Sequence, residues 1–280
     1  MPWGPRRFIM RRSIVMTKQL LAALTAAEAR ARLAPRPVIL VPLGSQEDQG
    51  PHVPMGDYRL AEVMAERIAA RAAALGTDTL VAPVVPFGAA DHFGHAPGGI
   101  ALSPAAFRAL LSEILEALLR HGQRRLVLIN GHGGNAAVIQ EVALAIREAR
   151  GVVVPTFPLW RAANGLLPAI LGAEKARAAS GHGADPLASV AMHLFPALMR
   201  PDLVPEPGGP ARFLGLPVSG LGTADFEAAE IQIPITFGEA APGGTLADAR
   251  LSSAETGAAL VAQLTELGAR FVAHYAKEIA

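Results

Sequence analysis

Four short loops of the sequence are rich in acidic, amide and imidazole side chains. Residues 44–57 read GSQEDQGPHVPMGD and residues 130–135 read NGHGGN, and two further loops with histidines lie at 89–99 and 180–185. Three of these loops follow apolar runs that are typical of buried strands. Carboxylates and imidazoles that converge from several strand ends can hold Zn²⁺ or Mn²⁺ and leave one position open for water. The loops therefore predict a catalytic metal site.

Each candidate also has an ordinary structural interpretation. Asp57 stands where a helix is expected to begin and could serve only as its N-cap, and Glu47 could be a solvated loop acid. The glycine-rich turn around His132 could bind an anion on backbone N–H groups. Neither the P-loop nor the dinucleotide-binding glycine pattern is present, which weakens that alternative. Histidines without polar neighbours in the sequence are interpreted as ordinary surface or core residues, namely His121, His193 and His274.

Strands that alternate with helices must position these loops. Strands buried on both faces read as nearly continuous apolar runs, and such runs lie at 37–43, 79–87, 124–130 and 151–157. Helices are expected after the capping box of Thr25 and Glu28, after Ser103, and over 58–75, 135–149 and 253–277. The alternation indicates an α/β fold, a mostly parallel β-sheet flanked by helices. Ligands bind beyond the carboxyl ends of such strands, which is where the polar loops fall.

Residues 158–251 have a looser pattern that is rich in Pro and Gly. Only one helix, near 186–195, is predicted there. We expect this region to supply walls of the active site or contacts between subunits.

Composition restricts the class of protein. The chain has 280 residues, of which 51% are hydrophobic, so we expect one large domain over residues 17–280 after a flexible N-terminal extension, residues 1–16. With a net charge of +1, the chain has no excess of basic residues that would indicate binding to the phosphates of nucleic acid. No apolar run is long enough for a secretory signal or a membrane span, and the absence of cysteine excludes thiol catalysis. We expect a cytoplasmic protein that binds a small-molecule substrate.

Three motifs together resemble the creatininase (creatinine amidohydrolase) family. They are Glu-x-x-Gly-Pro-His-x-Pro from Glu47, Asp-His with a later Pro-Gly-Gly from Asp91, and NGHGGN from Asn130. The resemblance covers about residues 37–257. It implies an α/β fold, a homo-oligomer that is commonly a hexamer, and hydrolysis of cyclic amides, formamides or peptide bonds at a pair of Zn²⁺, Mn²⁺ or Fe²⁺ ions. Some family members act on cyclic ketones derived from inositol.

The resemblance implies ligands for the first of the two ions. Glu47, Asp57 and His132 match the glutamate, the bridging aspartate and the histidine of that ion. Asp57 comes one residue earlier than the family spacing, so its match is less direct than the other two.

The expected ligands of the second ion are replaced. Gln49 stands at a family histidine, and Gly134 stands at the glutamate of the creatinine-hydrolysing members. Members with glycine there usually carry a glutamate in a later segment, where this chain has Leu187. A neutral amide is a poor ligand, and leucine offers no ligand atom. We therefore expect one divalent metal ion per subunit, either Zn, Mn or Fe.

The resemblance also suggests catalytic residues. His182 matches a family histidine that helps to deliver a proton to the departing nitrogen, and Asp185 could orient it. Histidine suits this task because its ordinary pKa lies near neutral pH. The residues expected to contact the substrate or to support the ligands are Gln49, His52, His92, Asn135 and Trp160.

The predicted function is metal-dependent hydrolysis of a C–N amide or an activated carbonyl in a small cyclic substrate, through a metal-bound water. Creatinine itself is disfavoured, because the residues of the second ion are those that changed. Two alternatives stay open. One is C–C cleavage or ring opening of a cyclic ketone, and the other is a catalytically inactive, oligomeric binding protein.

Overall fold

A four-stranded parallel sheet forms the centre of the molecule. The computed structural model describes residues 19–89, 96–207, 211–241 and 244–279, so the expected extension at 1–16 and His92 lie outside the described residues. The strands are β1 (Val38–Leu43), β2 (Thr79–Val81), β3 (Leu126–Asn130) and β4 (Thr156–Pro158), in the order β2-β1-β3-β4. All three pairings are parallel. The predicted α/β fold with a parallel sheet is confirmed.

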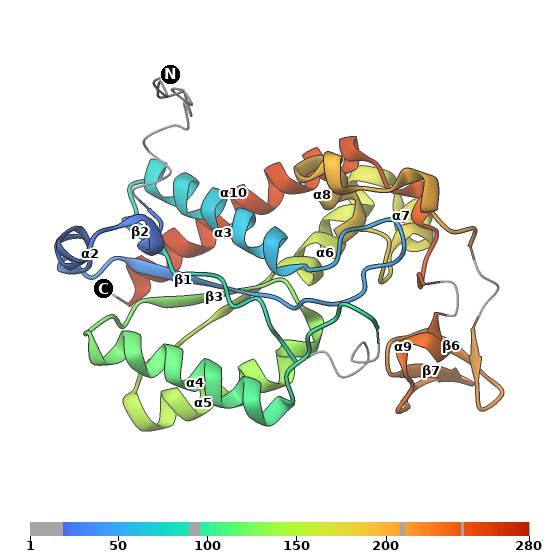
Figure 1. Cartoon of the computed structure of the whole chain (residues 1–280), viewed down its shortest axis with the longest axis horizontal. Coiled ribbons are helices and arrows are strands. Elements are labelled where there is room, and N and C mark those ends of the chain that lie inside the picture. The colour runs from blue at the N-terminus through green and yellow to red at the C-terminus, as the bar shows by residue number, and fades with distance from the viewer. Residues whose placement is uncertain (1–18, 90–95, 208–210, 242–243, 280) are drawn as a thin grey trace, which may run out of the picture.

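Helices cover both faces of this sheet (Figure 1). On one face lie α3 (Tyr58–Ala74), α6 (Leu159–Leu171), α8 (Leu187–Leu194) and α10 (Ala254–Glu278), and on the other lie α4 (Pro104–Arg120) and α5 (Ala136–Arg150). Side chains of a strand alternate between the two faces. Accordingly, Val38 and Leu40 pack in the core beneath α3 and α10, whereas Ile39 and Val41 pack in the core beneath α4 and α5.

Local signals place several helix ends where the sequence predicts them. The Ser103 hydroxyl accepts a hydrogen bond from the Ala106 N–H at 3.2 Å and begins α4. The capping box of Thr25 and Glu28 begins α2 (Ala26–Leu33). The remaining helices are α7 (Ala173–Ala179), α9 (Phe237–Ala240) and the 3-10 helices η1 (Leu21–Ala23), η2 (Gly133–Asn135), η3 (Pro196–Leu198), η4 (Pro201–Leu203) and η5 (Ala249–Leu251).

Two predicted strands are longer in the sequence than in the structure. The run 79–87 forms a strand only over β2, because Pro83 and Pro86 have no N–H group to donate to a neighbouring strand. Beyond β2 the run keeps a single bridge, between Val85 and Leu43. The run 151–157 joins the sheet only from Thr156, directly after Pro155.

The helix predicted near 186–195 is present as α8, but residues 158–251 contain more regular structure than the sequence pattern indicates. This region also contains α6 and α7, and the interior Gly165 and Pro168 of α6 obscure its helical pattern in the sequence. It further contains a small antiparallel sheet of β5 (Arg212–Phe213), β6 (Leu216–Gly220), β7 (Thr223–Phe226) and β8 (Ala229–Gln232). This small sheet and α9 lie together at one side of the molecule (Figure 1).

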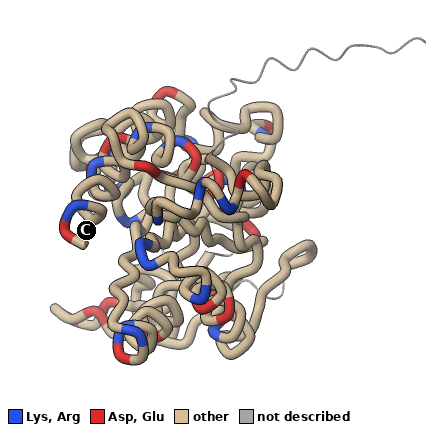
Figure 2. Tube along the Cα trace, turned by 90° about the vertical axis from the view of Figure 1, so that its left-hand side faces the viewer, with Lys and Arg blue, Asp and Glu red and all other residues tan. Residues whose placement is uncertain are grey.

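The surface carries charges of both signs. Figure 2 shows Lys and Arg segments interspersed with Asp and Glu segments on the face that it presents. Among the helices of the described chain, none combines the length and the apolar character needed to cross a bilayer.

Candidate metal centre

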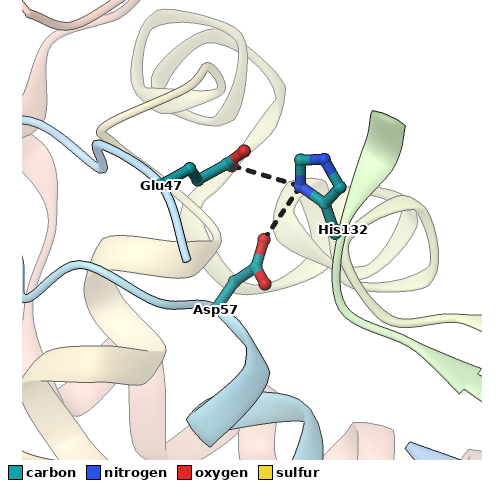
Figure 3. Close-up of side chains that lie close together, drawn as sticks. All are labelled: Glu47, Asp57 and His132. Carbon is teal, nitrogen blue, oxygen red and sulfur yellow. Dashed lines mark hydrogen bonds and ion pairs between the residues drawn. The ribbon is translucent and has the colours of Figure 1, made fainter. Parts of the chain in front are cut away.

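Three side chains from two neighbouring strand ends meet in the interior. Glu47 and Asp57 lie in the loop after β1, and His132 lies just after β3. Their exposed fractions are 3%, 2% and 4%, and one ligand atom of each lies within 4.8 Å of the others. Figure 3 shows both carboxylates directed toward one nitrogen of the imidazole. The structure thus brings together these three residues, which are called the buried cluster below.

The buried cluster brings three hydrogen-bond acceptors together. His132 Nδ1 lies 3.1 Å from Asp57 Oδ2 and 3.2 Å from Glu47 Oε1. The other ring nitrogen, Nε2, lies 3.0 Å from the carbonyl oxygen of Ala89. Because a carbonyl only accepts, this nitrogen carries a hydrogen, and Nδ1 of a neutral ring presents a lone pair to the two carboxylates. A cation, either a proton or a metal ion, must therefore lie between these groups.

Burial and charge together set the protonation of the cluster without a metal ion. Burial raises the pKa of Asp57 to about 7, against the opposing effect of its hydrogen bond with His132. Burial lowers the pKa of His132, but its hydrogen bonds with Asp57 and Glu47 outweigh this and raise that pKa well above its ordinary value. The metal-free cluster thus holds a proton between the imidazole and the carboxylates at neutral pH.

The residues of the cluster fit a divalent metal ion. Two carboxylate oxygens and one imidazole nitrogen form a donor set that suits Zn²⁺, Mn²⁺ or Fe²⁺. The second oxygen of Glu47, Oε2, is buried and has no hydrogen-bond partner in the described part of the chain. A divalent ion would satisfy this oxygen, replace the proton and balance two buried negative charges. The bond from His132 Nε2 to Ala89 resembles the outer hydrogen bond that orients most metal-binding histidines.

Asp57 does not act as a helix cap. It occupies the N-cap position of α3, but its side chain makes no capping hydrogen bond. Its Oδ1 instead accepts a hydrogen bond from the Ser45 N–H at 2.6 Å, which leaves Oδ2 for His132. Gly44 allows this close approach, because a Cβ at that position would lie 2.6 Å from Asp57 Oδ1. The interpretation of Asp57 as an N-cap alone is therefore wrong.

Asn135 connects the loops around the cluster. It is fully buried, and its Oδ1 accepts a hydrogen bond from the Ala89 N–H at 2.9 Å. Its amide nitrogen donates to the Gly44 carbonyl at 3.4 Å and to Asn130 Oδ1 at 3.3 Å. Asn130 in turn donates to the carbonyl of His132 at 2.7 Å. Asn135 thus holds Ala89, whose carbonyl fixes the His132 ring.

The three positions that depart from the family pattern line the same cavity as the cluster. Gln49 is 1% exposed and donates from Nε2 to Glu47 Oε1 at 2.8 Å. At Gly134 an added Cβ would collide with the Ala89 carbonyl oxygen and lie 2.5 Å from His132 Nε2. Leu187 places an apolar side chain against the cavity. In the ranges that the structure describes, the buried cluster is the one group of three His, Asp or Glu arranged for a metal ion.

The cavity beside the cluster has a volume of about 440 Å³. Its lining includes the apolar side chains of Trp160, Leu187 and Leu221. Trp160, expected as a wall of the pocket, does line it, and its indole N–H donates to the Gly131 carbonyl. Leu221, in the turn between β6 and β7, was not predicted, because nothing in the loosely patterned sequence signals that this turn reaches the cavity.

His182, which the sequence predicts to exchange a proton with the substrate, lines the cavity. Its Nε2 is 2.7 Å from the carbonyl oxygen of Asp48, the neighbour of Glu47. Its ring also meets the edge of Phe237 at a centroid distance of 4.7 Å and an angle of 66°. Burial lowers the pKa of His182, so its resting form at neutral pH is uncharged.

Asp185 also lines the cavity, but its contacts differ from those expected. Its Oδ1 accepts hydrogen bonds from the Ser189 hydroxyl and from the Ser189 N–H, the latter at 3.3 Å. Its Oδ2 is buried without a hydrogen-bond partner in the described chain. No hydrogen bond joins Asp185 to His182 within the described ranges, so the expected orienting role has no direct contact behind it.

His52 is 1% exposed but is absent from the residues that line the cavity. Both of its ring nitrogens lack a hydrogen-bond partner in the described chain, and burial lowers its pKa. Its backbone carbonyl accepts a hydrogen bond from the Arg200 N–H at 2.9 Å. The other expected supporting histidine, His92, lies outside the described residues.

Most of this chain matches a known protein family. A family model described as creatininase, creatinine amidohydrolase, matches residues 22–272. The mycofactocin precursor peptide peptidase of Mycolicibacterium smegmatis is 38% identical over 117 residues, which are 41% of this chain and 47% of that protein. The creatinine amidohydrolase of Pseudomonas putida is 35% identical over 142 residues, which are 48% of this chain and 53% of that protein. The chain thus spans about half the length of the curated relatives it matches.

The structural likeness extends further than the sequence match. A solved structure of creatininase with Mn has a TM-score of 0.70 and 27% sequence identity, covering 91% of this chain and 97% of that one. The likeness therefore includes nearly all of both chains.

Proposed function

This chain belongs to the creatininase family, and we propose that it is a metal-dependent hydrolase with one divalent ion per subunit. Its substrate would be a small, cyclic molecule with a C–N amide or an activated carbonyl. The observation that carries this proposal is the meeting of Glu47 Oε1, Asp57 Oδ2 and His132 Nδ1, three buried acceptors that need a cation between them.

The three residues of the buried cluster, which also line the cavity, would hold the ion. When bound, such an ion polarises a carbonyl and lowers the pKa of a water molecule to roughly 7. Gln49 holds the Glu47 carboxylate through its 2.8 Å hydrogen bond. The Ala89 carbonyl keeps the hydrogen of His132 on Nε2 and so keeps Nδ1 available as a ligand.

A single ion is favoured by the three departures from the family pattern. Gln49 is a neutral amide that already donates to Glu47, and Leu187 has no ligand atom. Gly134 has no room for a side chain unless the Ala89 carbonyl moves. Creatinine is disfavoured as the substrate because Gln49 and Gly134 stand where creatinine-hydrolysing members are expected to have ligands of a second ion.

His182 is proposed to transfer the proton. Because burial lowers its pKa, it starts uncharged and can accept a proton as a water molecule attacks the carbonyl carbon. The protonated ring can then deliver that proton to the departing nitrogen as the C–N bond breaks. The Asp48 carbonyl, 2.7 Å from Nε2, orients the ring during both steps.

Metal analysis tests the proposal directly. Purified protein that has been supplied with Zn²⁺, Mn²⁺ or Fe²⁺ should contain about one ion per chain. His132→Ala should abolish metal retention, since it removes a ligand, whereas Gln49→Ala should keep the ion and impair turnover. Two ions per chain in the unmodified protein, or equal loss of metal in both variants, would contradict the single-ion assignment.

A substrate screen separates the proposed reaction from its alternatives. Cyclic amides and cyclic ketones should be offered to the metal-loaded protein, with His182→Ala as the inactive reference. Turnover of ketones alone would favour C–C cleavage or ring opening. Retention of metal with no turnover in either class would favour a binding protein. The cytoplasmic location and the homo-oligomeric state remain predictions from the sequence and the family resemblance.

A further inference from the structure

Asp185, a residue that lines the cavity, has one carboxylate oxygen that is not used as an acceptor in the described chain. Asp185 is 0% exposed, and its Oδ1 is occupied by the Ser189 hydroxyl and N–H. Its Oδ2 is buried and finds no hydrogen-bond partner in the described chain, although the residue lines the cavity. A buried acceptor without a partner is costly, so such a group calls for an explanation.

The described residues around the cavity provide no cation for this carboxylate. Among the described residues that line the cavity there is no Lys or Arg. His182 is uncharged at neutral pH because burial lowers its pKa, and His132 faces Glu47 and Asp57 instead. A metal ion in the buried cluster would balance those two acids and leave Asp185 uncompensated. A ligand with a positive charge or a strong N–H donor would therefore complete the site.

Apolar side chains line the same cavity as this carboxylate. Leu187, two residues after Asp185, is 8% exposed and lines the same cavity. Leu221, in the β6–β7 turn, also lines the cavity and packs against the small apolar cluster of Phe237 and Ala241. An apolar group that displaced water from these two leucines would gain free energy in proportion to the area that it covers.

We propose that the substrate carries an amino group, or a comparable N–H donor, which binds Asp185 Oδ2 beside an apolar group that packs on Leu187 and Leu221. This inference rests on the proposed function, because the bond to be cleaved must lie at the metal ion of the same cavity. It narrows the substrate class to amides that pair an amine with an apolar substituent. It also makes Asp185 a substrate-binding residue.

Metal-binding probes of matched shape can test both halves of the inference. L-leucine hydroxamic acid carries a metal-binding group, an amine and an isobutyl group. 4-Methylpentanohydroxamic acid lacks only the amine, and glycine hydroxamic acid lacks only the isobutyl group. Isothermal titration of each probe into the Mn²⁺-loaded protein should show that the leucine compound binds about tenfold more tightly than either of the other two, or about 1.4 kcal/mol.

Two substitutions should separate the amine from the apolar group. Asp185→Asn keeps an oxygen for Ser189 and removes the charge, so it should abolish the preference for the amine and keep that for the isobutyl group. Leu221→Ser should do the reverse. Leu214, which is 78% exposed and absent from the cavity lining, provides the control, and Leu214→Ser should change neither preference.

The outcomes distinguish this inference from the function on which it rests. If the probes bind the metal-loaded protein with equal affinity, or if Asp185→Asn keeps the preference for the amine, the inference is overturned and the metal site stands. If none of the probes binds, the proposed metal site fails, and the inference fails with it.

Discussion

Replacement of Gly134 by alanine should weaken metal binding through the histidine beside it. An added Cβ would collide with the Ala89 carbonyl oxygen and lie 2.5 Å from His132 Nε2, so that carbonyl must retreat by roughly 1 Å. Its 3.0 Å hydrogen bond with Nε2 is then stretched or lost, and the ring no longer holds Nδ1 toward the two carboxylates.

The size of the effect follows from these contacts. Overpacking of a tight site costs about 1–3 kcal/mol, and a weakened buried hydrogen bond costs about 1 kcal/mol. The melting temperature of the metal-free protein should fall by roughly 5–10 °C. Because the Ala89 bond orients His132, the proposed metal ligand, metal affinity should fall by about 10-fold to 100-fold.

The neighbouring glycine supplies a matched control. An added Cβ at Gly133 meets nothing within 4 Å, so Gly133→Ala should change stability by about 0.5 kcal/mol or less. Scanning calorimetry of the metal-free variants and titration with Mn²⁺ measure both effects. If Gly134→Ala binds Mn²⁺ as tightly as Gly133→Ala does, then the Ala89 carbonyl does not orient His132, and the reasoning is refuted.

Other substitutions and conditions test the remaining parts of the site. Asn135→Ala should lower metal affinity about tenfold, because the Ala89 N–H loses its partner; unchanged affinity in a Mn²⁺ titration would contradict this. Metal affinity should rise as the pH increases from about 5.5 to about 8, because Asp57, with its pKa raised to about 7, must release a proton. For the same reason the metal-free fold should lose stability as the pH rises from about 4 to about 7, since folded Asp57 keeps a proton that the unfolded chain releases; thermal melts across this range check the sign. Gln49→His combined with Leu187→Glu should raise the Mn²⁺ content from one ion to two, and elemental analysis that still finds one would show that these positions are not the vacated ligands.

The parts of the molecule that the sequence predicts well are those set by local rules. The apolar run that becomes β1 and the one that becomes β3 are buried on both faces, and parallel pairing brings their carboxyl ends together. Glu47, Asp57 and His132 follow those ends, so their convergence could be anticipated. Helix starts such as Ser103 carry their own capping signal.

The parts that could not be predicted depend on contacts between distant segments. Asn135 supports the site through a hydrogen bond with the backbone N–H of Ala89, 46 residues away. A contact with the backbone leaves no signal in the sequence at position 89. The strands β5 to β8 are short and partly exposed, so they lack the apolar runs that mark the parallel sheet. Asp185 Oδ2 has no hydrogen-bond partner in the described chain because Ser189 binds the other oxygen of the carboxylate, and the sequence does not show how the two oxygens are used.

The small antiparallel sheet has a core of its own. Its apolar residues, including Ala224, Ile233 and Phe237, form clusters separate from the two that flank the parallel sheet, yet its β6–β7 turn delivers Leu221 to the cavity. The β6–β7 hairpin can therefore be varied without changing the two cores that flank the parallel sheet. Variation in its length and sequence is expected to alter which molecules enter the cavity while Glu47, Asp57 and His132 keep their places, and a library of variants confined to this hairpin would test selectivity separately from the buried cluster.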